Sequence, residues 1–272
     1  MKIKDHFLSK EEFEIKETEI KGIFKTYPIP ENIGKYYESK DYISHHQDSN
    51  SLKEKIYKFA QSFNLNYKRN ILSEVTFENA KVLDYGCGAG EFLKHIENDV
   101  ETFGFEPSND ARNFAKQKTS KTIFIENLNE LQNESLDVIT LWHVFEHIEN
   151  QTEILSLFRQ KLKPNGSLII AVPNCTSFDA KYYKEFWAAY DVPRHLFHFS
   201  RNGMKKIFNT ENWKLEKIKP LLLDSYYISI LSEKYKKNPL FFIFGGILGA
   251  ISNIKASKTG EFSSLIYIIR KI

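Results

Sequence analysis

The chain has 272 residues, which is enough for one large α/β domain with additions or for two small domains. Hydrophobic residues make up 42% and charged residues 27%, a balance that excludes an intrinsically disordered chain. Lysine and arginine number 38 against 35 acids, a formal net charge of +3, so no strong field attracts a polyanion and we expect no nucleic-acid partner.

The two cysteines, Cys87 and Cys175, are too few for a disulfide framework, which favours a reducing compartment. Residues 1–19 mix charged and apolar side chains and lack the apolar core of a signal peptide. We therefore expect a cytoplasmic protein.

Residues 1–70 precede the first clear strand and are rich in aromatic and polar side chains. Tyr36, Tyr37, Tyr42 and His45 cluster there, ahead of a run with helical periodicity. We predict that residues 1–70 form a helical and aromatic cap, with a helix at residues 51–63. Residues 71–272 are predicted to form one core domain with insertions at residues 174–199 and 222–262.

From residue 80 onward, short β-branched or apolar runs alternate with longer segments of helical periodicity. The predicted strands cover residues 81–85, 102–105, 122–125, 136–142, 167–172, 214–221 and 264–269. The predicted helices cover residues 91–97, 108–116, 150–162 and 200–210. Such alternation is typical of α/β proteins, so we predict a Rossmann-like, doubly wound, mostly parallel sheet with helices on both faces.

The second insertion contains an uncharged segment, PLFFIFGGILGAISNI, at residues 239–254. It falls short of the roughly 20 apolar residues that a membrane-spanning helix needs, so we predict no transmembrane segment. A buried helix or a pocket wall is the favoured interpretation, and a peripheral contact with a membrane or lipid is the alternative.

The turn DYGCGAG at residues 84–90 joins the first core strand to the first core helix. Its three alternate glycines would let a ligand approach the backbone closely. A pyrophosphate would meet the acid Glu91 at the helix start, whereas Asp84 can accept hydrogen bonds from an ammonium group or from loop amides. This favours a cationic amino-acid ligand over pyrophosphate. Glu106, at the end of the second core strand, is placed to bind two ribose hydroxyls.

The turn, Glu106 and two later motifs, LWHVFEHI at residues 141–148 and LKPNGS at residues 162–167, resemble class I S-adenosylmethionine (SAM)-dependent methyltransferases over residues 71–221. The resemblance implies SAM as cofactor and S-adenosylhomocysteine (SAH) as product. It implies that the glycines line the methionine moiety, that Glu106 holds the ribose, and that Asn127 and Leu128 flank the adenine. The expected cofactor residues are Asp84, Gly86, Cys87, Gly88, Gly90, Glu106, Pro107, Asn127, Leu128, Trp142 and His143.

Methyl transfer from a sulfonium needs an aligned acceptor and removal of its proton, so the acceptor site should offer a base. His143, at the end of the fourth core strand, is the first candidate. His195 is the second, with Asp191 orienting its ring and Arg194 holding an acidic substrate. For His195, Asp191 and Arg194, a purely structural role in local ion pairing and helix capping is an equally weighted alternative to catalysis.

The segment His143-x-x-Glu146-His147 is similar to a metal-binding pattern of ubiquinone-type O-methyltransferases, but histidine replaces its first glutamate. We therefore predict no bound metal, and a structural role for Glu146 and His147 in ordering their loop. The predicted function is SAM-dependent methyl transfer to a small-molecule, lipid or sugar-linked acceptor. The alternatives are an NAD-dependent oxidoreductase and a protein that binds SAM without turnover.

Overall fold

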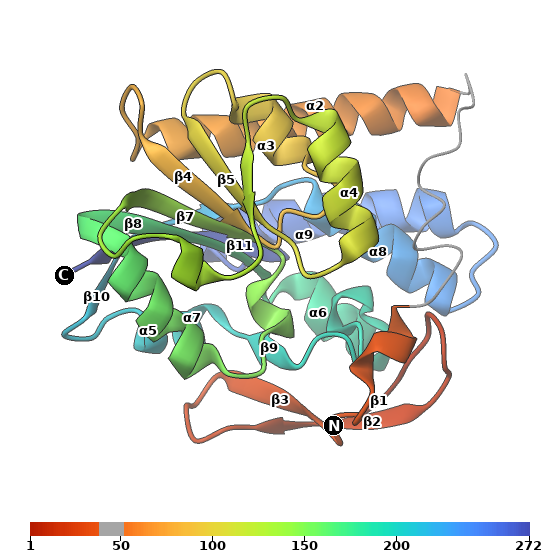
Figure 1. The fold of residues 1–272 in the computed structure, drawn as a ribbon. Helices are drawn as coiled ribbons and strands as arrows, with labels where there is room; N and C mark the ends of the chain where they lie inside the picture. Colours follow the sequence, from red (N-terminus) through yellow and green to blue (C-terminus); the bar gives the residue numbers. More distant parts are fainter. Residues whose placement is uncertain (38–51) are drawn as a thin grey trace.

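The computed structural model describes residues 1–37 and 52–272, and its centre is a seven-stranded sheet in the order β10-β11-β8-β7-β4-β5-β6 (Figure 1). The strands are β4 (Lys81–Tyr85), β5 (Glu101–Phe105), β6 (Ile123–Ile125), β7 (Leu136–Trp142), β8 (Leu162–Pro173), β10 (Trp213–Pro220) and β11 (Ser264–Lys271). Strands β4 to β8 pair in parallel, and β11 is antiparallel to both of its neighbours. The predicted mostly parallel α/β sheet is confirmed.

Helices cover both faces of this sheet, as predicted (Figure 1). The helices of the core are α2 (Leu52–Ser73), α3 (Glu91–Ile96), α4 (Asn109–Lys118), α5 (Gln151–Lys161) and α7 (Arg201–Ile207). Because successive strand residues point to opposite faces, Val82 of β4 packs with α2 and α3, whereas Leu83 packs with α5 and α7. The central strands are therefore buried on both sides.

Residues 1–37 form strands where a helical cap was predicted. Strands β1 (Lys2–Lys4), β2 (Glu12–Glu17) and β3 (Ile23–Tyr27) make an antiparallel sheet that β9 (Phe197–Phe199) completes. The prediction was wrong here because the apolar pattern has a period of two: Phe13 and Ile15 on β2 are buried. The 3₁₀ helix η1 (Ile33–Tyr36) follows, and Tyr42 and His45 lie outside the described residues. Helix α2 extends ten residues beyond its predicted end.

The insertion at residues 174–199 connects the N-terminal sheet to the core. It contains α6 (Phe178–Tyr183), the 3₁₀ helices η4 (Lys184–Phe186) and η5 (Ala188–Tyr190), and β9. Strand β9 pairs with β3, and Phe13 and Ile15 share a hydrophobic cluster with Trp187 and Val192. Residues more than 150 positions apart thus build one small core.

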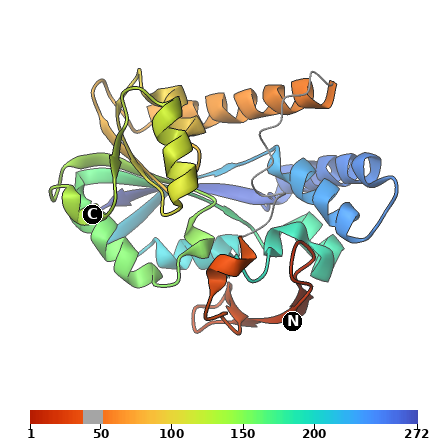
Figure 2. The ribbon, with the colours of Figure 1, turned by 45° about the vertical axis from the view of Figure 1, so that its right-hand side comes forward.

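The insertion at residues 222–262 forms two helices, α8 (Asp224–Tyr235) and α9 (Phe241–Thr259), which lie side by side (Figure 2). The expectation that residues 239–254 form a buried helix or a pocket wall holds for one side only: Leu248 and Ser252 are buried, whereas Phe242 and Ile243 are 61% and 57% exposed. Within the described residues, one side of α9 packs on α8 and α6, and the other side is exposed. None of the helices within residues 1–37 and 52–272 combines the length and apolar character needed to cross a membrane.

Candidate active site

The carboxyl ends of four neighbouring parallel strands lie at one edge of the main sheet. Gly86 follows β4, Glu106 follows β5, Asn127 lies just after β6, and Trp142 ends β7, with His143 next. Open α/β sheets bind ligands at this edge, beside the point where the strand order reverses. The structure therefore brings together the residues that the sequence assigned to the cofactor.

The glycine turn adopts backbone angles that favour glycine. Gly86, Gly88 and Gly90 have φ values of 78°, 53° and 76°. A Cβ atom on Gly86 would lie 2.6 Å from Cγ2 of Val144, and one on Gly90 would lie 2.9 Å from Cβ of Ala115. A Cβ atom on Gly88 would meet no described atom within 4 Å. Gly86 and Gly90 are thus needed for packing, whereas Gly88 borders open space that can admit a ligand.

Asp84, the acid before this turn, is buried and accepts a hydrogen bond of 2.7 Å from the Thr140 hydroxyl. Burial raises the pKa of its carboxyl to about 6, although the Thr140 bond and the charge of Lys68 oppose the rise. Lys68, on α2, was not predicted from the sequence. The Nζ atom of Lys68 lies 4.7 Å from the centre of the Trp142 ring. Burial lowers the pKa of Lys68, and the negative charges of Asp84 and Asp224 partly offset that decrease. A carboxylate and an ammonium group thus lie at one end of the turn.

Glu106 is held beside the glycine turn. Its carboxylate accepts hydrogen bonds of 2.9 Å from the backbone amides of both Gly88 and Ser108. Asn127 and Leu128 lie at the start of the 3₁₀ helix η2 (Leu128–Glu130), where Leu128 is buried and Asn127 caps the helix. Their predicted contacts with ribose and adenine are compatible with these positions and stay predictions.

Cys87, Pro107 and Trp142 complete the predicted cofactor set. Cys87 is buried, its amide donates to the Phe105 carbonyl at 3.0 Å, and burial raises the pKa of its thiol. Pro107 lies between β5 and α4. The Trp142 ring packs edge to face on Phe92, and its buried Nε1 has no hydrogen-bond partner among the described residues. Contact of these three with a cofactor stays a prediction.

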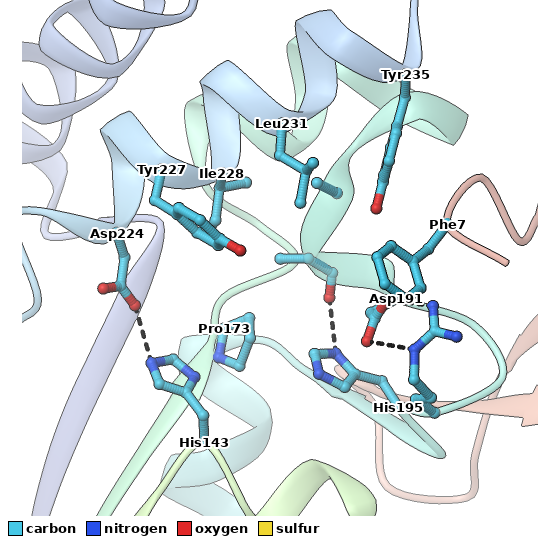
Figure 3. Close-up of a pocket in the computed structure, with 13 residues that line it drawn as sticks. Phe7, His143, Pro173, Asp191, His195, Asp224, Tyr227, Ile228, Leu231 and Tyr235 are labelled. Carbon is cyan, nitrogen blue, oxygen red and sulfur yellow. Dashed lines mark hydrogen bonds and ion pairs between the residues drawn. The ribbon is translucent and has the colours of Figure 1, made fainter. Parts of the chain in front are cut away.

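A cavity of about 460 Å³ is lined by His143, the residue that follows Trp142 (Figure 3). Its volume is within the range of small-molecule sites. One face of α8 forms a wall, whose lining side chains are Asp224, Tyr227, Ile228, Leu231 and Tyr235. Figure 3 shows this wall facing His143 and His195 across the cavity. The wall was not predicted, although its helical spacing of three and four residues was visible in the sequence.

His143 is enclosed by two carboxylates. Its Nε2 lies 2.9 Å from Oδ2 of Asp224 and its Nδ1 lies 3.3 Å from Oε1 of Glu146. Burial would lower its pKa, but the charges and hydrogen bonds of Asp224 and Glu146 outweigh burial and raise the pKa to about 10. The ring is therefore a cation at neutral pH and has no free nitrogen to accept a proton. The geometry argues against His143 as the base.

His195 has the free nitrogen that His143 lacks. Its Nδ1 lies 2.9 Å from the carbonyl oxygen of Ala189, so Nδ1 carries the proton and Nε2 keeps its lone pair. Burial, together with the charge of His147, lowers the pKa of His195 to about 4, so the ring is neutral at physiological pH. His195 also lines the cavity. Of the two predicted bases, it is the one that the geometry supports.

Asp191 and Arg194 pair with each other, which is the local ion pairing that the sequence left as the alternative to their predicted roles in the site. The Arg194 guanidinium donates to the Asp191 carboxylate at 2.6 and 2.9 Å and to Asp5 at 3.3 Å, and it also reaches the Tyr36 carbonyl at 3.1 Å. Its side chain is 1% exposed. Arg194 therefore has little capacity left for an acidic substrate, and the carbonyl of Ala189, not the carboxylate of Asp191, orients His195.

Glu146, His147 and His195 bring three potential metal ligands within 4.8 Å of one another. Nδ1 of His147 lies 2.8 Å from the Arg194 carbonyl oxygen, which leaves Nε2 of both histidines available. The buried Oε2 of Glu146 has no hydrogen-bond partner among the described residues. Two imidazoles and a carboxylate are ligand types found in zinc and non-haem iron sites. The predicted absence of a metal stays a prediction, which metal analysis of the purified protein would test.

Comparison with known sequences identifies the domain. A family model described as a methyltransferase domain matches residues 55–218, more than half of the chain. An uncharacterized protein of Methanocaldococcus jannaschii is 31% identical over 176 residues, 61% of this chain and 66% of that protein. The ubiquinone biosynthesis O-methyltransferase of Photobacterium profundum is 30% identical over 103 residues, 35% of this chain and 44% of that protein. The chain thus spans less than two thirds of these curated relatives.

Solved structures share the fold. A putative methyltransferase of Haloferax volcanii, in complex with the Trm112 methyltransferase activator, has a TM-score of 0.57 at 14% identity, over 79% of this chain and 92% of that chain. The Haemonchus contortus phosphoethanolamine N-methyltransferase 2, in complex with phosphomonomethylethanolamine and SAH, has a TM-score of 0.55 at 14% identity, over 91% and 62%. At such identities the likeness shows the fold alone. With the family match, it establishes that the chain belongs to the class I SAM-dependent methyltransferase domains, whose methyl donor is SAM.

Proposed function

We propose that this protein transfers the methyl group of SAM to a small-molecule or lipid-like acceptor held in the cavity beside α8. The observation that carries the proposal is the continuity of the two sites. His143 directly follows Trp142 at the end of β7 and also lines the cavity. Asp224 of the cavity wall binds His143 and acts electrostatically on Lys68 at the cofactor edge. A donor at the sheet edge and an acceptor in the cavity would therefore meet.

The residues at the sheet edge fit SAM. Asp84 and Lys68 offer a carboxylate and an ammonium group, which match the opposite charges of the methionine moiety. Glu106, which lies beside Gly88, would accept hydrogen bonds from the ribose, and the open space at Gly88 would admit the ligand. When bound, SAM supplies an electrophilic methyl group on its sulfonium, so the protein has to align the acceptor and receive its proton.

The cavity walls favour a lipophilic acceptor. Ile228 and Leu231 from α8, with Phe7 and Pro173 from other segments, give the walls a largely apolar character. The curated relatives named ubiquinone biosynthesis O-methyltransferase support a hydroxyl group on a lipophilic molecule as the first acceptor class to test. A sugar-linked acceptor stays the alternative.

His195 is the base in this proposal. Its Nε2 is unprotonated, and the hydrogen bond from Nδ1 to Ala189 holds the required tautomer. A hydroxyl group becomes strongly acidic as its oxygen attacks the methyl group, so even a weak base such as the buried His195 can take the proton in the transition state. His143, already a cation, would orient the cavity wall through Asp224.

Ligand binding gives the first test. In a thermal-shift titration, SAM or SAH at about 100 times its dissociation constant should stabilise the protein by about 2.7 kcal/mol. NAD is the control ligand and Gly88→Asp the control variant, which should lose the shift. A shift with NAD alone would support the oxidoreductase. Binding of SAM without turnover of any acceptor would support the non-catalytic alternative.

The base is tested by substitution once an acceptor is found in a screen for SAH release. We expect His195→Gln to lower kcat at least a hundredfold while SAM still binds. The matched control is His95→Gln, because His95 lies on α3 against Asn66, away from the cavity lining. Equal turnover of the two variants would rule out His195 as the base.

A further inference from the structure

The turn before α9 and the first half of that helix expose a continuous run of large apolar side chains. We call it the α9 apolar face, and its members are Leu240, Phe241, Phe242, Ile243, Phe244 and Ile247. Each is at least 36% exposed, and no charged residue interrupts the run. Single exposed apolar residues are ordinary on protein surfaces, but a contiguous patch marks a contact site.

The opposite side of α9 prevents this face from turning inward. A Cβ atom on Gly245 would lie 2.4 Å from Cα of Ile230, and one on Gly249 would lie 2.7 Å from Cα of Tyr226, so α8 and α9 pack backbone to backbone. Farther along, the Ser252 hydroxyl is buried and donates to Asp179 at 2.8 Å. The rotation of α9 is therefore determined, and its apolar face is held toward solvent.

The exposed charges around this face are mainly positive, although Glu233 and Glu261 flank the segment and Glu233 pairs with Lys236. Between residues 234 and 260 the chain contains five lysines and no acid, and all five lysines are exposed: Lys234, Lys236, Lys237, Lys255 and Lys258. Lys236 and Lys237 lie in the turn where the apolar residues begin, and Lys234 lies in the last turn of α8. In both views this turn lies at the outer edge of the molecule, away from the main sheet (Figures 1 and 2).

We propose that the α9 apolar face binds the surface of an anionic membrane, with α9 lying in the interface and not crossing it. Helices bind in this way when aromatic and aliphatic side chains enter the acyl region and lysines contact anionic headgroups. A second copy of the chain is a poorer occupant, because a symmetric contact would bring two lysine groups together, and the neighbouring acid Glu233 is buried and already lies 3.7 Å from Lys236. Membrane binding does not require catalysis, so this inference is independent of the proposed reaction.

Membrane binding would also place the cavity near lipids. Helix α8 separates the α9 apolar face from the cavity, and Tyr227 of α8 both lines the cavity and is 64% exposed. An acceptor that partitions into the membrane would then need to travel only past α8. This consequence rests on the proposed function, whereas membrane binding itself does not.

The test is flotation of the full chain with lipid vesicles. We expect at least tenfold stronger binding to phosphatidylcholine vesicles containing phosphatidylglycerol than to pure phosphatidylcholine, with weaker binding at high salt. The double variant Phe242→Ser/Ile243→Ser should lose at least tenfold in binding. The matched control is Phe77→Ser/Ile123→Ser, which replaces two apolar residues of similar exposure elsewhere and should bind like the original chain.

Unfolding temperatures of all variants establish that each is folded, since these positions are exposed. Absence of binding to anionic vesicles, or equal loss in both double variants, would overturn the proposal. Light scattering gives the other decisive result: a dimer that Phe242→Ser/Ile243→Ser dissociates would show that a second copy occupies the face instead.

Discussion

Asp224→Asn removes one of the two carboxylates that hold His143 as a cation. Asp224 is 17% and His143 33% exposed, and Nε2 and Oδ2 are 2.9 Å apart. A hydrogen bond to a charged group contributes about 1.5–3 kcal/mol to the free energy of unfolding. Because the pair is partly exposed and the asparagine keeps one oxygen as an acceptor, we expect the variant to lose about 2 kcal/mol. For a domain of this size, that loss lowers the melting temperature by about 4–8 °C.

The loss should depend on pH with a defined sign. The pKa of His143 is raised to about 10 in the folded state, so the stability that it contributes is fully present below its unfolded pKa of 6.5 and disappears as pH rises toward 10. The pKa of Asp224 is lowered: burial opposes this, but the charge and hydrogen bond of His143 prevail. The difference in unfolding free energy between the original chain and the variant should therefore be largest near pH 6.

Urea unfolding at pH 6 and at pH 10 measures this difference. The matched control is Asp99→Asn, which removes the carboxylate of an exposed ion pair with Arg69 and should cost less than about 1 kcal/mol at either pH. If Asp224→Asn costs no more than Asp99→Asn, or if its cost is the same at both pH values, then His143 is not held as a cation and the argument that excludes it as the base fails.

Three further results are expected. Because the raised pKa of Asp84 leaves its carboxyl protonated below about pH 6, the dissociation constant of SAM should rise by up to about tenfold per pH unit below that point; calorimetry should find no such slope for Asp84→Asn. Gly88→Ala should lower the free energy of unfolding by about 1–2 kcal/mol, because Gly88 has a positive φ, and should weaken SAM binding at least tenfold. Gly86→Ala should be less stable still, because its Cβ atom would also meet Val144. A higher melting temperature for Gly86→Ala than for Gly88→Ala would contradict this. Arg194→Met should cost about 3–5 kcal/mol in urea unfolding because it leaves the buried Asp5 and the partly buried Asp191 without their cation. Lost turnover at unchanged stability would instead support its predicted role in substrate binding.

The arrangement of the sheet edge that carries the predicted cofactor residues could be predicted because its signals are local. The bounds of β4 and β7 match their predicted ranges, since each is a short apolar run that ends at a turn. The glycine turn and Glu106 lie within 23 residues of each other in sequence, in one β-α-β unit. The conformation of such a unit depends mainly on neighbours in the chain, so reading residue types in order was enough.

The acceptor side was not predictable in this way. Arg194 looked free to bind a substrate, but it meets Asp5, which is 189 residues away in sequence. His143 looked like a base until Asp224 supplied its second carboxylate. Lys68 belongs to no sequence motif and is one of several basic residues on α2. Only the folded structure shows that it lies beside Trp142.

The sequence by itself determined the α/β class, the order of the core strands along the chain and the position of the glycine turn, because these depend on periodicity and on residues close together in the chain. Tertiary structure alone decided that β9 completes the N-terminal sheet, that α8 walls the cavity, and that α9 turns its apolar side to solvent. The protonation state and the exposure of a side chain depend on the residues around it. For His143, Arg194 and Phe242, those residues come from other segments of the chain.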